Sequence, residues 1–527
     1  MGETSSYWDF PYPSRRMPVL AKNCVATTQP LAAQAGLSML QRGGNAVDAA
    51  VATAIALTVV EPVNNGLGSD LFAILWDGTK LTGLNASGRS PAAWNPSLFT
   101  EQAMPHEGWN SATIPGAVSA WVALSKRFGK LPFATLVEPA IRYARDGFLV
   151  SPVISQIWKN QVARLKDQPG FAPTFLPRGR APEPGEHFRP PDQAKTLTKI
   201  AETGGEDFYR GALAATIARA AKEGGGYITE TDLAAHTSDF LDPIDVEFRG
   251  HRIHEIPPNG QGIGALIALG LLDRLDVEGL APDSPELLHL EIEALKLGVA
   301  DVRDHVADPG HMTVAPKDLL DPARLDELAR GIARDVIAVP APRSMHRGAT
   351  VYLAAADQNG MMVSLIQSNY HGFGSGVVVP GTGIALNNRA SCFVTRAGHP
   401  NRVGPKKRPL NTIIPGFITK GGAPVAAFGV MGGTMQPQGH TQMAVRMLAC
   451  GQNPQTAIDA PRWRVEGDDV WIEPEMAKAT QAGLRARGHK LSEEPSLHFG
   501  AAQTILCVEN GYLAASESRR DGCAVGF

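Results

Sequence analysis

Cysteine is scarce in this sequence, and the few cysteines form no recognisable site. The 527 residues include 5 cysteines, which are widely spaced and contain no Cys-x-x-Cys pair. That spacing excludes a zinc knuckle and a thioredoxin-like motif, and an odd number of thiols argues against a disulfide framework. We therefore expect a protein of a reducing compartment, the cytoplasm, with no metal site.

Long hydrophobic runs and an excess of one charge are also missing. The longest apolar run, 49–60, has about a dozen residues, whereas a membrane-spanning helix needs about 20. No basic segment followed by an apolar stretch opens the sequence, so we expect no secretory signal. The 49 Lys and Arg residues nearly balance 52 Asp and Glu, for a formal net charge of -3. This balance predicts neither nucleic acid nor a membrane as a partner.

Glycine and proline are abundant, with 55 and 40 residues. No low-complexity stretch accompanies them, so they indicate turns and closely approaching backbones rather than disorder. The length is about two to four times that of a typical domain, which by itself favours several domains. A large enzyme can also wrap one continuous core, so both arrangements stay open at this point.

Two helices near the start of the sequence are predicted from the residues that end or begin them. Residues 31–41 have a helical pattern that Gly43 ends, because glycine adopts the conformation that closes many helices. Asn45 can cap a second helix over 46–60. Apolar residues surround this second helix on all sides, so we expect it to be buried.

A long helix is predicted over 285–305, and two of its residues invite a metal-site interpretation. His289 and Glu293 stand four positions apart and therefore share one face of the helix. With Glu291 between them, the pattern is not that of a zinc protease. We expect a solvated helix face rather than a metal site.

A hairpin follows the segment 339–343, which we expect to be an exposed linker. Residues 350–356 and 361–367 are short apolar runs typical of strands, and a turn at 357–360 joins them. The Asn-Gly pair of this turn accepts the positive backbone dihedral angles that tight hairpins require. The sequence after the linker therefore begins with a strand pair suited to the centre of a sheet.

Two further patterns carry little information. Residues 259–264 contain glycines spaced as in a dinucleotide-binding loop, but we expect no strand–helix unit around them and reject that function. His371 lies close to the hairpin in sequence, and no role can be assigned to it.

Seven short blocks, spread over nearly the whole chain from about residue 20, occur together in one known order. The blocks are Gly43-Gly44-Asn45-Ala46-Val47-Asp48-Ala49-Ala50, Glu61-Pro62, Ile114-Pro115-Gly116, Gly348-Ala349-Thr350-Val351-Tyr352, Phe373-Gly374-Ser375-Gly376, Arg408-Pro409-Leu410 and Met431-Gly432-Gly433. In order and spacing the chain resembles the γ-glutamyltranspeptidases, within the N-terminal-nucleophile hydrolase superfamily. Any one block is weak, but the ordered set is specific.

The resemblance implies a fold and a processing event. The family's fold is a four-layer αββα sandwich of the α+β class. Cleavage of the Ala349–Thr350 bond would give a large subunit, 1–349, and a small subunit, 350–527, that together form one intertwined core. Thr350 would open the small subunit as the nucleophile.

Elementary chemistry agrees with that assignment of Thr350. A threonine hydroxyl is a poor nucleophile unless a nearby base accepts its proton. An N-terminal amine on the same residue can do so, because its unperturbed pKa lies near 8. Gly348 and Ala349 add little bulk that would obstruct attack on the carbonyl before Thr350. The alternative is that Thr350 merely opens a strand, as a β-branched residue often does.

Three further residues match catalytic positions of the family. Gly432 and Gly433 match the glycine pair whose backbone N–H groups stabilise the oxyanion, a role that close approach restricts to small residues. Ser368 stands where the family has a threonine that hydrogen-bonds the nucleophile. Alternatively, Gly432 and Gly433 form a simple turn, and Ser368 is an ordinary serine at the end of a strand.

The substrate pocket departs from the family pattern. Typical members bind the α-carboxylate of a glutamyl group through an arginine and two serines, and its ammonium through an acidic residue. Ser87 occupies the arginine position, with Arg89 close to it but out of register. The corresponding family segments here read Arg389-Ala390-Ser391-Cys392, Asn411-Thr412 and Tyr370.

The changed pocket still retains one cation that could bind an acid. Arg389 could hold a carboxylate, with a surface ion pair as its alternative role. The string from Gln367 to His371, with Asn388 and Arg389, is similar to a divergent bacterial branch that includes oxamate amidohydrolase. This favours a small or atypical amide acid over glutathione.

The sequence therefore predicts an autoprocessing amidohydrolase or acyltransferase without a cofactor. It would cleave a γ-glutamyl compound or a similar small acidic amide, with water or an amine as acceptor. An oxamate-type amidohydrolase and a β-lactam side-chain acylase remain open within the same chemistry. A non-processing binding protein is the alternative of a different class, and a homodimer is one oligomeric state left open.

Overall fold

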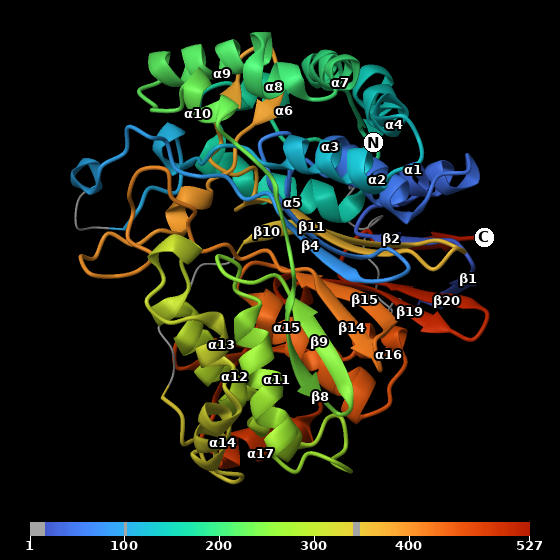
Figure 1. The fold of residues 1–527 in the computed structure, drawn as a ribbon, viewed down its shortest axis with the longest axis vertical. Helices are drawn as coiled ribbons and strands as arrows, with labels where there is room; N and C mark the ends of the chain where they lie inside the picture. Colours follow the sequence, from blue (N-terminus) through green and yellow to red (C-terminus); the bar gives the residue numbers. More distant parts are fainter. Residues whose placement is uncertain (1–15, 100–102, 341–347) are drawn as a thin grey trace, which may run out of the picture.

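Two sheets lie face to face at the centre of the molecule, with helices covering both outer faces (Figure 1). The structure is a computed structural model that describes residues 16–99, 103–340 and 348–527. Chain segments before and after residue 350 contribute to both sheets. The predicted αββα sandwich is confirmed, and buried side chains of both sheets pack together between them.

The first sheet carries the predicted hairpin at its centre, and its ladders are antiparallel throughout. Its strands, in spatial order, are β21 (Cys523–Gly526), β2 (Cys24–Thr27), β10 (Ala349–Ala356), β11 (Met362–Tyr370), β3 (Asp70–Trp76), β4 (Leu81–Asn85) and β7 (Asp239–Leu241).

The second sheet is also antiparallel and packs against the first. Its strands, in spatial order, are β1 (Val19–Ala21), β20 (Gly511–Ser516), β19 (Ala501–Val508), β15 (Ala423–Met431), β14 (Gly416–Lys420), β9 (His251–Glu255) and β8 (Ile244–Phe248). Shorter strands lie outside the two sheets: β5 (Phe148–Leu149), β6 (His187–Phe188), β12 (Val378–Val379), β13 (Ile384–Ala385), β16 (Trp463–Glu466), β17 (Asp469–Ile472) and β18 (Lys490–Glu493).

Each outer face has its own set of helices (Figure 1). On the side of the first sheet are α1 (Pro30–Gln41), α2 (Ala46–Val60), α3 (Ala117–Phe128), α4 (Phe133–Asp146), α5 (Pro152–Leu165), α6 (Phe171–Phe175), α7 (Pro191–Thr203), α8 (Glu206–Arg210), α9 (Ala212–Glu223) and α10 (Glu230–Ala234). On the side of the second are α11 (Ile263–Arg274), α12 (Pro285–His305), α13 (Pro316–Leu319), α14 (Pro322–Arg330), α15 (Met435–Ala444), α16 (Pro454–Asp459) and α17 (Lys478–Ala486).

The predicted helices at 31–41, 46–60 and 285–305 are confirmed as α1, α2 and α12. Helix α2 begins at a capping box, in which Asn45 accepts from the N–H of Asp48 while the Asp48 carboxylate accepts from the N–H of Asn45. Every residue of α2 is buried, as its uniformly apolar surface predicts.

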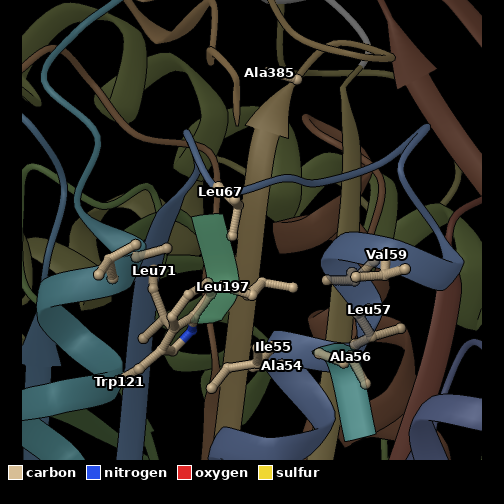
Figure 2. Close-up of a cluster of buried hydrophobic side chains, with 14 of the residues drawn as sticks. Ala54, Ile55, Ala56, Leu57, Val59, Leu67, Leu71, Trp121, Leu197 and Ala385 are labelled. Atoms are coloured by element: carbon tan, nitrogen blue, oxygen red, sulfur yellow. The ribbon is translucent and has the colours of Figure 1, made fainter. Parts of the chain in front are cut away.

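Helix α2 lies under a dense apolar layer that joins it to the first sheet. Figure 2 shows Ile55 and Leu57 of α2 in one cluster with Leu71 of β3 and Trp121 of α3. The indole N–H of Trp121 donates to Gln367 Oε1 of β11 at 2.9 Å, so the one polar atom of this ring has a partner. This layer fixes the outer face of β11, whose opposite face carries the candidate site.

Two local predictions need correction. In the turn after β10, Gly360 has a positive φ of 90° but Asn359 does not, because the Asp357 carboxylate accepts from the Asn359 N–H and closes the turn instead. Of the predicted exposed linker, Val339 is buried and its N–H donates to the Glu293 carboxylate, Pro340 is exposed as predicted, and 341–343 lie outside the described residues.

Candidate functional site

Thr350 lies in β10 at an irregular point of the sheet. Its neighbours Val351 and Ala349 pair with Gln367 and Tyr370, so β11 carries one extra residue opposite Thr350. Such bulges redirect side chains and are common beside active sites. Thr350 is fully buried, and its side chain meets that of Ser368 on β11.

The Ser368 hydroxyl contacts both sides of the Ala349–Thr350 peptide bond. Thr350 Oγ1 donates to Ser368 Oγ at 3.2 Å, and Ser368 Oγ donates to the carbonyl oxygen of Ala349 at 2.6 Å. The N–H of Tyr370 donates to the same Ser368 oxygen at 2.7 Å and fixes its position. Tyr370 does so with a φ of 79°, a backbone conformation that is costly for a residue with a side chain.

The predicted glycine pair lies directly beside this contact. Gly432 and Gly433 join β15 to α15 with φ values of 127° and 63°, which favour glycine. A Cβ added to Gly348 would lie 3.0 Å from the Gly433 Cα, so the two segments approach too closely for side chains. Within the described ranges, no acceptor faces the N–H of either Gly432 or Gly433. Free N–H groups at a helix start are suited to an anionic oxygen.

Gln261 ties the glycine pair to the neighbouring polar segment. Its side-chain Nε2 donates to the Gly433 carbonyl at 2.8 Å and to the Thr412 carbonyl at 2.6 Å.

The expectation that no strand–helix unit surrounds 259–264 is wrong, because β9 precedes this segment and α11 follows it. The neighbours of β9 run antiparallel, so the unit is not the parallel βαβ of dinucleotide-binding folds.

Arg389 is fully buried and faces a carboxylate. Its Nε lies 3.3 Å from Asp70 Oδ2, and its Nη1 donates to Thr412 Oγ1 at 2.7 Å. Asn411 Nδ2 donates to the same Asp70 oxygen at 3.0 Å. Burial raises the pKa of Asp70 above its ordinary value, and the neighbouring Arg389 opposes that shift. Asp70 therefore holds two of the predicted substrate-binding residues, Arg389 and Asn411, and Arg389 in turn contacts Thr412.

One edge of the Arg389 guanidinium group has no protein partner. Nη2 is buried and makes no hydrogen bond among the described residues. The flat face of the group lies over the Tyr370 ring, 4.6 Å from its centroid, and the ring of His371 stacks on Tyr370 at 4.2 Å. A buried N–H pair without a partner is costly, so this edge suits a ligand acceptor.

Among the described residues, those singled out only by alignment with the family or by helix spacing do not contact Thr350 or Arg389. Arg89 pairs with Asp308 in a half-exposed position, and the Ser87 hydroxyl donates to Asn85. The expectation that His289 and Glu293 lie on a solvated face is wrong, because both are fully buried. His289 contacts His489, and Glu293 pairs with Lys296. In the described part of the chain, no three metal-ligating side chains come together.

Three residues of the site escape the sequence analysis: Asp70, Gln261 and Gln436. Asp70 opens an otherwise apolar strand, and a carboxylate in such a place requires a buried cation, which is a usable signal. Gln436 places its Nε2 3.5 Å from Thr350 Oγ1, and only tertiary structure brings them together.

None of the described helices has the length and apolar character needed to cross a membrane.

The chain is similar to known proteins over nearly its full length. The model of the family described as gamma-glutamyltranspeptidase matches residues 32–527. A glutathione hydrolase-like proenzyme, YwrD, of Bacillus subtilis is 36% identical over 96% of this chain and 98% of its own length. An oxamate amidohydrolase proenzyme of Klebsiella pneumoniae is 35% identical over 94% and 97%. The crystal structure of a cephalosporin acylase from Bacillus halodurans has a TM-score of 0.94 and 45% identity, covering 99% of this chain and 98% of that one.

Proposed function

The chain belongs to the gamma-glutamyltranspeptidase family, and on that premise we propose that it is a self-cleaving amidohydrolase or acyltransferase with Thr350 as its nucleophile. The observation that carries the proposal is the contact of Ser368 with both the Thr350 hydroxyl and the Ala349 carbonyl. The attacking oxygen and the bond it would attack are thus held together before any cleavage.

The first reaction would be cleavage of the chain itself. Thr350 Oγ1 attacks the Ala349 carbonyl carbon, the C–N bond breaks, and the hydroxyl proton passes to the nitrogen, which becomes an amine. Water then opens the resulting ester and leaves fragments 1–349 and 350–527. Ser368 would stabilise the carbonyl oxygen while it is negatively charged. The fragments would stay associated, because both sheets contain strands from each.

The second reaction would use the same oxygen on a substrate amide. The new α-amine of Thr350 accepts the hydroxyl proton while Oγ1 bonds to the substrate carbonyl carbon. The amide C–N bond then breaks, the ammonium group gives the proton to the leaving amine, and the acyl group stays on Oγ1 as an ester. The N–H groups of Gly432 and Gly433 would donate to the tetrahedral oxyanion. Transfer of the acyl group to water gives hydrolysis, and transfer to an amine gives a new amide, so no cofactor is required.

A small amide with an acidic acyl group is the substrate class that the pocket supports. Arg389 offers its free Nη2 edge to a carboxylate, while Tyr370 covers one face and Thr412 and Asn411 add polar contacts. Because Asp70 already occupies Nε, the carboxylate would bind Nη2 rather than the Nε side of the guanidinium group. Oxamate and γ-glutamyl amides both fit this description.

Acylase activity toward a β-lactam side chain is the second candidate. It is favoured by the high similarity to the Bacillus halodurans cephalosporin acylase, which extends over 99% of this chain. An acidic side chain on the β-lactam, such as a glutaryl group, would use the same Arg389 contact. The two candidates therefore differ in the leaving amine and not in the acyl pocket.

Intact mass under denaturing conditions tests the proposed nucleophile. The purified protein should give two fragments, the smaller beginning at Thr350, while the Thr350→Ala variant should give one chain. Thr350→Ser should still process, more slowly, because it keeps the hydroxyl. A single intact chain in the unmodified protein after long incubation would instead favour the non-processing binding protein.

Substrate choice is tested with the processed protein. Ammonia release from oxamate, hydrolysis of a γ-glutamyl anilide and deacylation of a glutaryl β-lactam should be compared at equal enzyme concentration. Loss of every activity in Thr350→Ala is required. Turnover of neutral amides at rates equal to those of the acidic ones would contradict the acidic-acyl proposal.

We also propose a cytoplasmic location, supported by the absence of any disulfide among the five cysteines. Fractionation of the native host, with the mature fragments found outside the soluble cytoplasmic fraction, would contradict it. A homodimer of the processed unit stays a prediction, which light scattering can test.

A further inference from the structure

Gln436 lies at the second position of α15, three residues after Gly433, and is fully buried. Its Oε1 accepts from the N–H of Ile414 at 2.9 Å. Because a backbone N–H can only donate, this contact assigns the oxygen end of the amide. The opposite end, Nε2, is therefore a donor, and it lies 3.5 Å from Thr350 Oγ1.

The Thr350 oxygen is a donor on one side and an acceptor on the other. Its proton is directed to Ser368 Oγ, so its lone pairs are left to accept from Gln436 Nε2. The contacts form one directed series, from Gln436 to Thr350, to Ser368 and to the Ala349 carbonyl. Such a series allows each hydrogen bond to polarise the next.

We propose that Gln436 is a further catalytic residue, whose side-chain amide donates to the nucleophilic oxygen of Thr350. The proposal rests on the proposed function of Thr350. When Oγ1 transfers its proton to the α-amine and attacks, negative charge develops on Oγ1, and a neutral donor stabilises it. An amide side chain cannot accept that proton at neutral pH, so Gln436 does not compete with the amine as the base.

The same contact acts again when the acyl-enzyme breaks down. The α-amine of Thr350 accepts a proton from water while the water oxygen adds to the ester carbonyl carbon, and the bond from that carbon to Oγ1 then breaks, leaving its electron pair on Oγ1. The ammonium group of Thr350 returns the proton to this oxygen. A hydrogen bond from Gln436 stabilises the departing oxygen, so both half-reactions gain from it.

A second buried glutamine of the same helix provides a matched control. Among the described residues, the Gln442 side chain hydrogen-bonds to the backbone of Trp463, with Nε2 donating to the carbonyl at 2.9 Å and Oε1 accepting from the N–H. It therefore ties α15 to the chain around it without touching the site. Gln436 has one such backbone contact, to Ile414, and replaces the other with Thr350.

Two substitutions separate the donor from the backbone contact. Gln436→Glu, assayed at a pH where its carboxyl is ionised, keeps an oxygen for the Ile414 N–H but removes the donor to Thr350, whereas Gln436→Met removes both. We expect both variants to process more slowly and to lose kcat by about 10- to 100-fold, with KM nearly unchanged, as for loss of one hydrogen bond to a charged group. Gln442→Met should process and turn over at the rate of the unmodified protein.

The measurements are the time course of fragment formation and steady-state kinetics on oxamate and a γ-glutamyl anilide, with a thermal melt of each variant. A slow Gln436→Met beside an unimpaired Gln436→Glu would assign Gln436 to the Ile414 contact and overturn the proposal. Unchanged rates in both would also overturn it. If the unmodified protein neither processes nor turns over, the proposed function itself fails, which is a separate outcome.

Discussion

The hydroxyl of Ser368 donates to the carbonyl oxygen of Ala349, 2.6 Å away, while it accepts from the hydroxyl of Thr350. One side chain therefore touches both the proposed nucleophilic oxygen and the carbonyl group that it would attack. A hydrogen bond to the carbonyl makes its carbon more electrophilic, and the contact with Thr350 keeps Oγ1 beside it. The geometry is present in the uncleaved chain, so we expect the proposed processing to need no other protein.

Ser368→Ala should slow self-cleavage on the order of 100-fold, because the oxyanion loses a donor. Ser368→Thr keeps the hydroxyl and should process at a rate close to that of the unmodified chain. The matched control is Ser364→Ala, because Ser364 lies on the same face of β11 but contacts Tyr352 and the Phe428 carbonyl. Gel time courses measure the rates, and equal slowing in Ser364→Ala would assign the effect to packing.

Arg389→Lys should raise KM for an acidic substrate by about 10- to 100-fold, the cost of one charge-assisted hydrogen bond. A neutral amide should show little change in KM, since it has no group for the Nη2 edge. Lysine keeps the positive charge facing Asp70, which limits damage to the fold. Steady-state kinetics on both substrates measure the ratio, and equal effects on both would remove Arg389 from the pocket.

Asp70→Asn should destabilise the protein by about 3–5 kcal/mol, because it leaves Arg389 as an unpaired buried cation. The experiment belongs in the Thr350→Ala background, where the chain stays in one piece and unfolding does not separate fragments. Arg42→Ala, which breaks the exposed pair with Glu138, should change stability by no more than about 1 kcal/mol. Urea titration compares the two, and a similar small loss in both would contradict the pairing argument.

Glu291 should make the fold less stable as the pH rises. Burial raises the pKa of Glu291 from 4.5 to about 7, with Trp463 Nε1 as its hydrogen-bond donor. The unfolded chain releases this proton at lower pH than the folded chain, so the contribution is full below pH 4.5 and is lost as the pH rises through 7.

Glu291→Gln keeps an oxygen for Trp463 and removes the titration. The substitution is made in the Thr350→Ala chain. When the pH rises from 5 to 8, the free energy of unfolding should fall less in this variant than in the parent Thr350→Ala chain, by on the order of 1–3 kcal/mol. Urea midpoints at several pH values measure this difference. Glu138→Gln, at an exposed carboxylate, serves as the control, and parallel pH curves for all three chains would show that Glu291 does not titrate in this range.

The sequence predicts the bounds of a helix well where neighbouring residues cap its end. Helix α2 begins at the capping box of Asn45 and Asp48, and α12 begins at Ser284 followed by Pro285, so their bounds match the predictions. The turn at 357–360 was placed correctly, but its conformation was not, because the Asp357 side chain competes with the expected Asn-Gly geometry.

The predicted substrate-binding residues show which features local sequence patterns cannot predict. Arg389 was predicted as a carboxylate ligand, with a surface ion pair as the alternative, and it forms a buried pair with Asp70 while keeping one free edge. The two residues are 319 positions apart, and no periodicity or spacing relates them. For the same reason His289 and Glu293 look solvated in sequence, although α17 and the segment before the processing site bury them.

The sequence by itself determined the family, the helices α1, α2 and α12 and the central hairpin, and it marked Thr350 and the glycine pair as candidate site residues. These depend on short local patterns, in which backbone geometry and side-chain chemistry are set within a few residues. Only the tertiary structure decided that Asp70 holds Arg389, that Gln261 fixes Gly433 and that Gln436 reaches Thr350. Buried polar groups must find partners wherever the folded backbone places them, and that pairing is a property of the packed sheets and not of local sequence.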